Sequence, residues 1–123
     1  MKYLLMIYGD EAAMAGVSPS DAEKTTGAYM AYTEAMIKAG AYVGGERLRP
    51  TNAATTVRAV NGATKVLNGP YAETREQLGG YYMIDVPDLD QALSWASRCP
   101  GASHGSIEVR PIWPLDTLAG HAA

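Results

Sequence analysis

The spacing of hydrophobic residues along the chain changes between strict alternation and a period close to that of a helix. Alternation is typical of strands, and the helical period is typical of helices that bury one face. Ser18-Pro19 and Asp88 are residue types that commonly begin helices. In chain order the pattern predicts a strand over 2–8, a loop over 9–16, a helix over 19–39, strands over 41–48, 55–60, 63–67 and 81–86, a helix over 89–99 and a strand over 106–112.

The first strand is apolar on both of its alternating faces, which predicts a central position in a sheet that is covered on both sides. Gly44-Gly45 predicts a bulge or a close backbone approach in the second strand. Asn61-Gly62 predicts a tight hairpin turn. The predicted buried stripes are Ala22, Thr26, Tyr29, Thr33, Met36 and Ile37 in the first helix, and Leu89, Ala92, Leu93 and Ala96 in the second.

The order of these elements predicts an α+β fold. Without the hairpin, the order strand, helix, strand, strand, helix, strand is the ferredoxin-like split βαβ pattern. Right-handed crossovers place both helices on one face of such a sheet. We therefore expect a single ferredoxin-like domain over 1–123 with an inserted β-hairpin and a short tail from about residue 114.

Two helices cover only one face of this sheet, and the opposite face is expected to be largely apolar. The last strand should place Ser106, Glu108 and Arg110 there, while the first strand adds an apolar row in either orientation. A broad apolar patch is unusual on a small monomer. The pattern therefore favours a homodimer with sheet packed on sheet. The alternative is that the segment after Ile112, with Trp113 and Leu115, folds across the face.

Composition and charge narrow the classes of function. The chain has 123 residues and a net charge of −3, and it contains no basic run. A protein that binds nucleic acid directly usually clusters Lys and Arg, so this class is not expected. The single Cys99 excludes an internal disulfide and fits a reducing cytoplasm. The apolar run at the start is too short for a typical signal peptide, and no stretch has membrane-spanning length.

The polar stretch over 68–80 is the densest in the chain and connects two apolar strands. One interpretation is structural: a turn followed by a capping box over 74–77 and a helical turn that ends at Gly79. The other is a rim over a sheet-lined pocket, formed by Asn68, Tyr71, Glu73 and Arg75. Function concentrates on loops of this kind.

Charged residues at strand ends supply the other candidates. Asp10 follows the first strand and would act as a general base if burial raised its pKa; the alternative is a loop residue that hydrogen-bonds nearby backbone. Glu46 and Arg47 lie on opposite faces of their strand, and an internal ion-pair network is the alternative to a ligand site. The candidate catalytic residues are Asp10 and Glu108, and the candidate ligand-binding residues are Tyr8, Glu46, Arg47, Asn68, Tyr71, Glu73, Arg75, Tyr81 and Arg110.

Other reactive residue types occur without a catalytic pattern. His104 is an isolated loop histidine and is expected to be exposed rather than catalytic. Cys99 precedes a proline and is expected to pack at a helix end. No nucleotide-binding or metal-binding motif occurs, so no cofactor and no metal are predicted.

Four segments, taken in order, resemble the DGPF-type branch of the YCII-related family. They are residues 2–11, Gly44-Gly45-Glu46-Arg47-Leu48, the stretch over 68–86, and Glu108-Val109-Arg110-Pro111. Asn68 stands where the family usually has aspartate, and Tyr71 where it has phenylalanine. The resemblance implies a ferredoxin-like subunit that forms a dimeric α/β barrel. The resemblance implies little about activity. Better-understood YCII-like proteins use a His–Asp pair in a cleft, and one relative is a dehydrochlorinase of chlorinated hydroquinones. The histidines of this chain, His104 and His121, do not lie on the first strand or helix, where that pair is expected.

Two hypotheses from different classes follow. In the first, a cytoplasmic homodimer binds a small organic acid or aromatic ligand in a sheet-lined cavity and carries out acid–base lyase or isomerase chemistry. In the second, the chain is a non-catalytic regulatory module. DGPF-type domains resemble modules that accompany extracytoplasmic-function sigma factors, so a sigma factor is the implied partner. Neither hypothesis involves a membrane or direct contact with nucleic acid.

Overall fold

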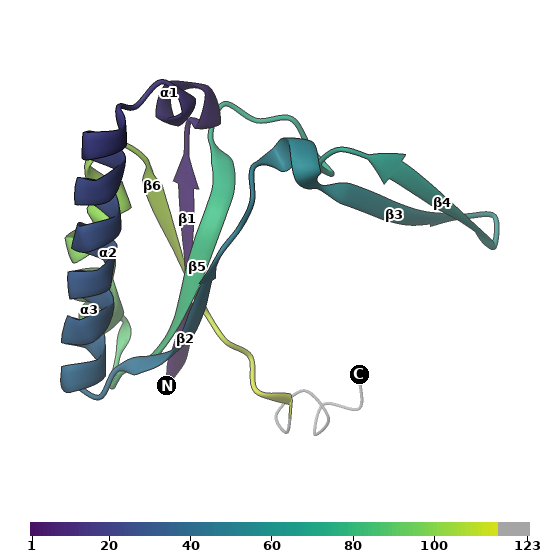
Figure 1. Cartoon of the computed structure of the whole chain (residues 1–123). Coiled ribbons are helices and arrows are strands. Elements are labelled where there is room, and N and C mark those ends of the chain that lie inside the picture. The colour runs from purple at the N-terminus through teal and green to yellow at the C-terminus, as the bar shows by residue number, and fades with distance from the viewer. Residues whose placement is uncertain (116–123) are drawn as a thin grey trace.

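A four-stranded antiparallel sheet lies at the centre of the computed structural model, which describes residues 1–115 of the chain (Figure 1). Helices α2 and α3 cover one face of this sheet, and a two-stranded hairpin extends from the body on the opposite side. In sheet order the strands are β2 (Tyr42–Arg47), β5 (Gln77–Asp85), β1 (Lys2–Gly9) and β6 (Ser106–Pro111). The helices are α1 (Glu11–Ala15), α2 (Pro19–Lys38) and α3 (Leu89–Arg98), with 3-10 turns η1 (Thr51–Ala53) and η2 (Pro100–Ser103); the hairpin strands are β3 (Thr55–Val60) and β4 (Ala63–Asn68).

The sheet order confirms an α+β fold. β1 pairs with β5 on one side and with β6 on the other, so its predicted central position is confirmed. One helix follows β1 and the other follows β5 along the chain. This arrangement is consistent with the predicted ferredoxin-like pattern. The predicted tail lies almost entirely outside the described residues.

The core lies between the sheet and the two long helices. Leu5, Met36 and Ile84 are completely buried there. Tyr32 packs edge-on against Tyr82, with ring centroids 5.4 Å apart, and against Trp95 at 6.0 Å. Aromatic pairs of this geometry add stability beyond the area they bury.

The predicted helix stripes are only partly right. In α2, Met36 is buried and Tyr29 and Thr33 are half-buried, but Ala22, Thr26 and Ile37 are exposed. In α3, Ala92 and Ala96 are buried, whereas Leu89 and Leu93 are each 47% exposed. The reason is that the rings of Tyr32 and Trp95 fill the space between the two helices and the sheet. The stripes are therefore rotated toward these rings.

The bulge predicted at Gly44-Gly45 and the tight turn predicted at Asn61-Gly62 both occur. The register of β2 against β5 shifts between Tyr42 and Gly44, which is a bulge. A Cβ atom added to Gly45 would lie 2.7 Å from the carbonyl oxygen of Tyr81, so only glycine fits. The hairpin turn is also confirmed, because Asn61 and Gly62 have φ angles of 51° and 79°, as a tight hairpin turn requires.

Two local predictions are wrong. The predicted loop over 9–16 contains α1, because the Asp10 side chain accepts hydrogen bonds from the backbone of Ala12 and Ala13 and caps this helix. The predicted helical turn over 74–79 is absent, and β5 begins at Gln77 instead. The Gln77 side chain accepts a hydrogen bond from the Glu11 N–H at 2.9 Å, so a distant segment takes the place of the local capping box.

The face of the sheet opposite the helices, here the helix-free face, carries two cross-strand rows. One row runs Glu46, Tyr81, Met6, Glu108, and the next runs Gly44, Met83, Leu4, Arg110. Residues directly opposite one another in a sheet point to the same side. Leu4, Met6, Tyr81 and Met83 are half-buried. The prediction that Glu108 and Arg110 share this face is thus confirmed, and Glu46 rather than Arg47 lies on it.

The short segment after β6 leaves this face largely uncovered within the described residues. Trp113 is 64% exposed and Leu115 is 80% exposed. The alternative in which this segment folds across the face is therefore not supported by residues 112–115. The remainder of the tail lies outside the described residues.

Candidate functional site

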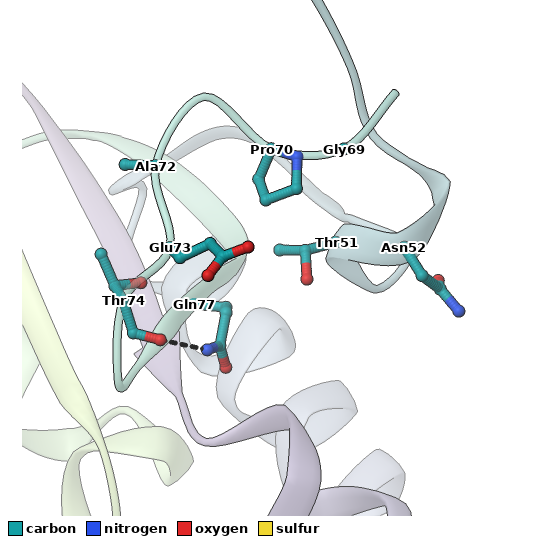
Figure 2. A pocket seen from close by; sticks show the side chains of 8 residues that line it. All are labelled: Thr51, Asn52, Gly69, Pro70, Ala72, Glu73, Thr74 and Gln77. Atoms are coloured by element: carbon teal, nitrogen blue, oxygen red, sulfur yellow. Dashed lines mark hydrogen bonds between the residues drawn. The ribbon is translucent and has the colours of Figure 1, made fainter. Parts of the chain in front are cut away.

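The segment over 69–77 lines two depressions at one end of the sheet. The first has a volume of about 440 Å³ and is lined by Asp10, Arg75, Glu76 and His104. The second has a volume of about 330 Å³ and is shown in Figure 2. The polar stretch identified in the sequence therefore contributes to both hollows.

The first depression combines groups from three distant parts of the chain. Asp10 lies between β1 and α1, Arg75 and Glu76 immediately precede β5, and His104 lies between η2 and β6. β1 is antiparallel to both β5 and β6. The end of β1 therefore meets the starts of the other two strands, and this topology brings the four residues together.

Hydrogen bonds fix two of these side chains. Asp10 Oδ1 accepts from the N–H groups of Ala12 and Ala13, at 3.0 and 3.2 Å, which is the backbone-bonding role weighed as the alternative for this residue. Glu76 Oε1 accepts from Ser106 Oγ at 2.7 Å, which ties the segment to the start of β6. Both carboxylates thus have one oxygen engaged within the protein.

The contacts of His104 define its tautomer. Ser103 Oγ donates to the carbonyl oxygen of Pro100 at 3.1 Å and lies 3.0 Å from His104 Nδ1. A hydroxyl group has a single hydrogen, so the imidazole Nδ1 must be the donor in the second contact. In the neutral ring Nε2 then carries the lone pair. His104, which lines the depression, then has Nε2 as its proton-accepting nitrogen.

Arg75 supplies a cation without an internal partner. Within residues 1–115 the ion pairs are those of the Met1 amino group with Asp85, Lys38 with Glu34, and Arg110 with Glu108. Arg75 is in none of them, and it is exposed. A planar guanidinium binds a carboxylate through two parallel hydrogen bonds. The depression therefore offers an anchor for an organic acid.

The second depression is walled by the same segment and by η1. The Glu73 carboxylate points toward Thr51 in Figure 2, and the Gln77 amide donates to the carbonyl of Thr74. Behind this wall the Glu11 carboxylate accepts from Thr51 N at 2.8 Å and from Thr51 Oγ1 at 2.7 Å. The lining residues are Thr51, Asn52, Gly69, Pro70, Ala72, Glu73, Thr74 and Gln77.

Five of the other predicted site residues lie on the helix-free face, away from the two depressions. Tyr8, Glu46, Tyr81, Glu108 and Arg110 are on the helix-free face, with Arg110 bonded to Glu108. Asp10 and Glu108, the predicted catalytic pair, are thus on different parts of the molecule.

The four residues of the predicted rim do not line one common pocket. Glu73 lines the second depression and Arg75 the first, whereas Asn68 ends β4. Tyr71 is 78% exposed, and the guanidinium of Arg58 lies 5.7 Å from its ring centroid. Arg47 is exposed on the opposite side of β2 from Glu46.

The structure confirms that His104 is exposed, and it also places this residue in the first depression, which the sequence argument did not predict. Nothing near it in the chain marks a site, because its neighbours in the depression are about 30 and 94 positions away. The only local signal is the adjacent Ser103, whose hydroxyl orients the ring.

A buried polar seam lies on the helix side of the sheet. Burial raises the pKa of Tyr29, Tyr32 and Tyr82, and it also raises the pKa of the Cys99 thiol. Thr33 and Tyr82 share a hydrogen bond of 2.8 Å, and Cys99 Sγ lies 3.9 Å from Tyr29 Oη. A thiol held protonated is a poor nucleophile. The contacts support the packing role expected for Cys99.

Within residues 1–115, no three His, Cys, Asp or Glu side chains gather closely enough to hold a metal ion. None of the helices in this range has the length and apolar character needed to span a membrane.

Comparison with known proteins places the chain in a family. The profile of the YCII-related domain matches residues 1–116. A protein of Rhizobium meliloti (strain 1021), which is described as uncharacterized, is 40% identical over 114 residues that cover 91% of this chain and 92% of that protein. The predicted assignment to the DGPF-type branch stays a prediction. Over nearly its whole length, the chain belongs to the YCII-related family.

Proposed function

We propose that this protein binds a small organic acid in the depression formed by Asp10, Arg75, Glu76 and His104. The observation that carries the proposal is the convergence of a guanidinium, an imidazole and two carboxylates from three separate parts of the chain. Arg75 binds the carboxylate of the ligand, and the engaged carboxylates of Asp10 and Glu76 line the wall. Pockets with a few convergent polar groups are the usual sites for small ligands.

His104 is the acid–base group of the proposed chemistry. Its Nε2 lone pair accepts a proton from the carbon beside the bound carboxylate, and the C–H electron pair becomes a carbon–carbon double bond. In a lyase, a group on the next carbon then leaves with its bonding electrons. In an isomerase, the substrate already has a double bond one carbon further along; as the new double bond forms, the electron pair of the old one moves to its far carbon, and His104 returns the proton to that carbon. Histidine is the side chain most often used as a general acid or base, which suits both steps.

The predicted homodimer is part of the same proposal. Leu4, Met6, Tyr81 and Met83 form an apolar, half-buried area on the helix-free face. A second copy packed on this face by two-fold symmetry would remove that area from water. It would also enclose Glu46, Glu108 and Arg110 in a sheet-lined space, which is the cavity expected from the sequence.

A thermal-shift screen of small mono- and dicarboxylic acids tests the ligand site. A ligand at 100 times its dissociation constant stabilises a folded protein by about 2.7 kcal/mol, which for a chain of this size raises the melting temperature by roughly 10 °C. Arg75→Gln should abolish that increase. The matched control is Arg47→Gln, because Arg47 is also exposed and unpaired within residues 1–115 but lies outside the depression. Equal ligand shifts in both variants would refute the site.

His104→Asn separates binding from chemistry. The asparagine side chain retains a polar group of similar reach but cannot act as a base near neutral pH. Ligand stabilisation should persist in this variant while turnover falls by a factor of roughly 100 to 10,000. Turnover that is equal to that of the unmodified chain would exclude His104 as the acid–base group.

The regulatory alternative would bind a protein partner through the exposed loops. The convergence of Asp10, Arg75, Glu76 and His104 in one depression favours ligand binding over a sigma-factor partner. Retention of a purified extracytoplasmic-function sigma factor by the immobilised chain would support the alternative.

A further inference from the structure

The hairpin formed by β3 and β4, here called the arm, is largely exposed within residues 1–115, although the guanidinium of Arg58 lies 5.7 Å from the ring centroid of Tyr71. Every residue of its two strands is exposed except Thr56, which is half-buried. Figure 1 shows the arm extending from the sheet on the side away from α2 and α3. A two-stranded hairpin alone in water is marginally stable. A partner surface is therefore needed to explain an ordered arm.

The base of the arm is held firmly by hydrogen bonds. Glu11 binds Thr51 through both carboxylate oxygens, just before the arm begins. At the other end the Gly69 N–H donates to the Ala54 carbonyl at 2.8 Å, and Thr56 Oγ1 donates to the Gly69 carbonyl at 2.9 Å. These contacts fix the direction in which the arm leaves the body.

The two faces of the arm differ in charge. On one face Val57 lies directly opposite Val66, each 62% exposed, next to the pair of Ala59 and Thr64. On the other face Arg58 lies directly opposite Lys65, between Leu67 and Val60, which are 51% and 41% exposed. Neither cation forms an ion pair within residues 1–115. Like charges in opposite positions destabilise a hairpin unless a negative group lies nearby.

We propose that the arm clasps a second copy of this chain. The arm and the half-buried apolar area of the helix-free face are on the same side of the molecule. Strands of six residues span about 20 Å, whereas stacked sheets lie about 10 Å apart. When two copies pack through their helix-free faces, each arm therefore reaches past the partner's sheet and lies on the partner subunit.

Placement and net charge favour a copy of the same chain as the occupant. The face with Val57 and Val66 packs on the partner and excludes water, so Arg58 and Lys65 on the opposite face point away from that contact. The chain has a net charge of −3, and the summed field of a negatively charged partner attracts these two cations over a longer range. The inference rests on the sheet-to-sheet dimer proposed above and not on the ligand site.

Sedimentation equilibrium on the full chain tests the clasp through Val57→Asp. Val17→Asp is the matched control, because Val17 is 43% exposed and lies before α2, away from the arm. Two copies of Val57 are buried in a symmetric dimer, so Val57→Asp should raise the dimer dissociation constant by roughly 100-fold or more. Equal dissociation constants for the two variants would overturn the clasp.

Hydrogen exchange of the unmodified chain gives a second readout that does not depend on a variant. Amides over 55–68 should become protected together with those of β1 as protein concentration rises through the dissociation constant. A dimer whose arm amides exchange at the same rate at all concentrations would overturn the clasp and leave the dimer intact. A chain that stays monomeric at 100 µM would overturn both. Neither outcome bears on binding of an organic acid by Arg75.

Discussion

The hydroxyl group of Tyr32 makes a buried contact whose removal has a calculable effect. This hydroxyl donates to the carbonyl oxygen of Trp95 at 2.6 Å, and the tyrosine is only 6% exposed. Trp95 lies in the last turn of α3, where carbonyl groups lack helical partners. The Cys99 N–H that would otherwise approach it bonds to Ala96 instead. Tyr32→Phe therefore leaves a buried carbonyl without its hydrogen bond.

The expected cost is the penalty for one buried unsatisfied acceptor, about 1–3 kcal/mol. At about 4 °C per kcal/mol for a chain of this length, the melting temperature should fall by roughly 4–12 °C. The ring itself is retained, so its contacts with Tyr82 and Trp95 should change little. Urea unfolding followed by circular dichroism and by Trp fluorescence measures the loss, at one fixed protein concentration.

Tyr71→Phe is the matched control, since Tyr71 is 78% exposed and loses its hydroxyl to water rather than to a protein partner. Its unfolding free energy should change by less than about 0.5 kcal/mol. If Tyr32→Phe and Tyr71→Phe had the same stability, the account of how α3 is anchored to α2 would be incorrect.

Two further predictions concern the backbone and the buried phenols. Gly45→Ala should destabilise the fold by about 1–3 kcal/mol because its Cβ would meet the Tyr81 carbonyl. Gly44→Ala, whose Cβ would have no atom within 4 Å, should not destabilise it, and the urea midpoints of the two variants measure the difference. Burial raises the pKa of Tyr29 and Tyr32 above the unfolded value near 10, so the unfolded chain releases these protons first. The buried Cys99 thiol, whose pKa is also raised, should make stability begin to fall above about pH 8, and the phenols should steepen the fall above about pH 9. The slope should reach about 1.4 kcal/mol per pH unit for each group, in urea titrations from pH 7 to 11; a flat profile would contradict this account.

The sequence predicted the elements whose signals are local. Short apolar or alternating runs located all six strands. Asn61-Gly62 located the hairpin turn, because a two-residue turn depends only on its own backbone angles. The start of β5 was missed because Gln77 bonds to Glu11, which is 66 positions away. The buried sides of the helices were misplaced because a stripe of small and aliphatic residues cannot reveal that Tyr32 and Trp95 pack together.

The site was harder to predict for the same reason. Asp10 was chosen as a candidate because it follows a strand, and Arg75 because it belongs to the dense polar stretch over 68–80; both line the first depression. His104 was set aside as an isolated loop residue, because only the antiparallel register of β1 with β6 brings it near Asp10. Its tautomer depends in turn on Ser103 and Pro100. Residue type indicated the chemistry, but register decided which groups meet.

The segment over 69–77 connects the two proposals physically. It ends the arm at Gly69, lines the second depression through Glu73, and contributes Arg75 to the first. Gln77 and Glu11 then join this segment to α1, which Asp10 caps. A displacement of the arm at its base would therefore act on both walls of the first depression. Ligand affinity measured in Val57→Asp should equal that of the unmodified chain, because the substitution lies far along the arm and leaves the Gly69 and Thr51 hydrogen bonds in place.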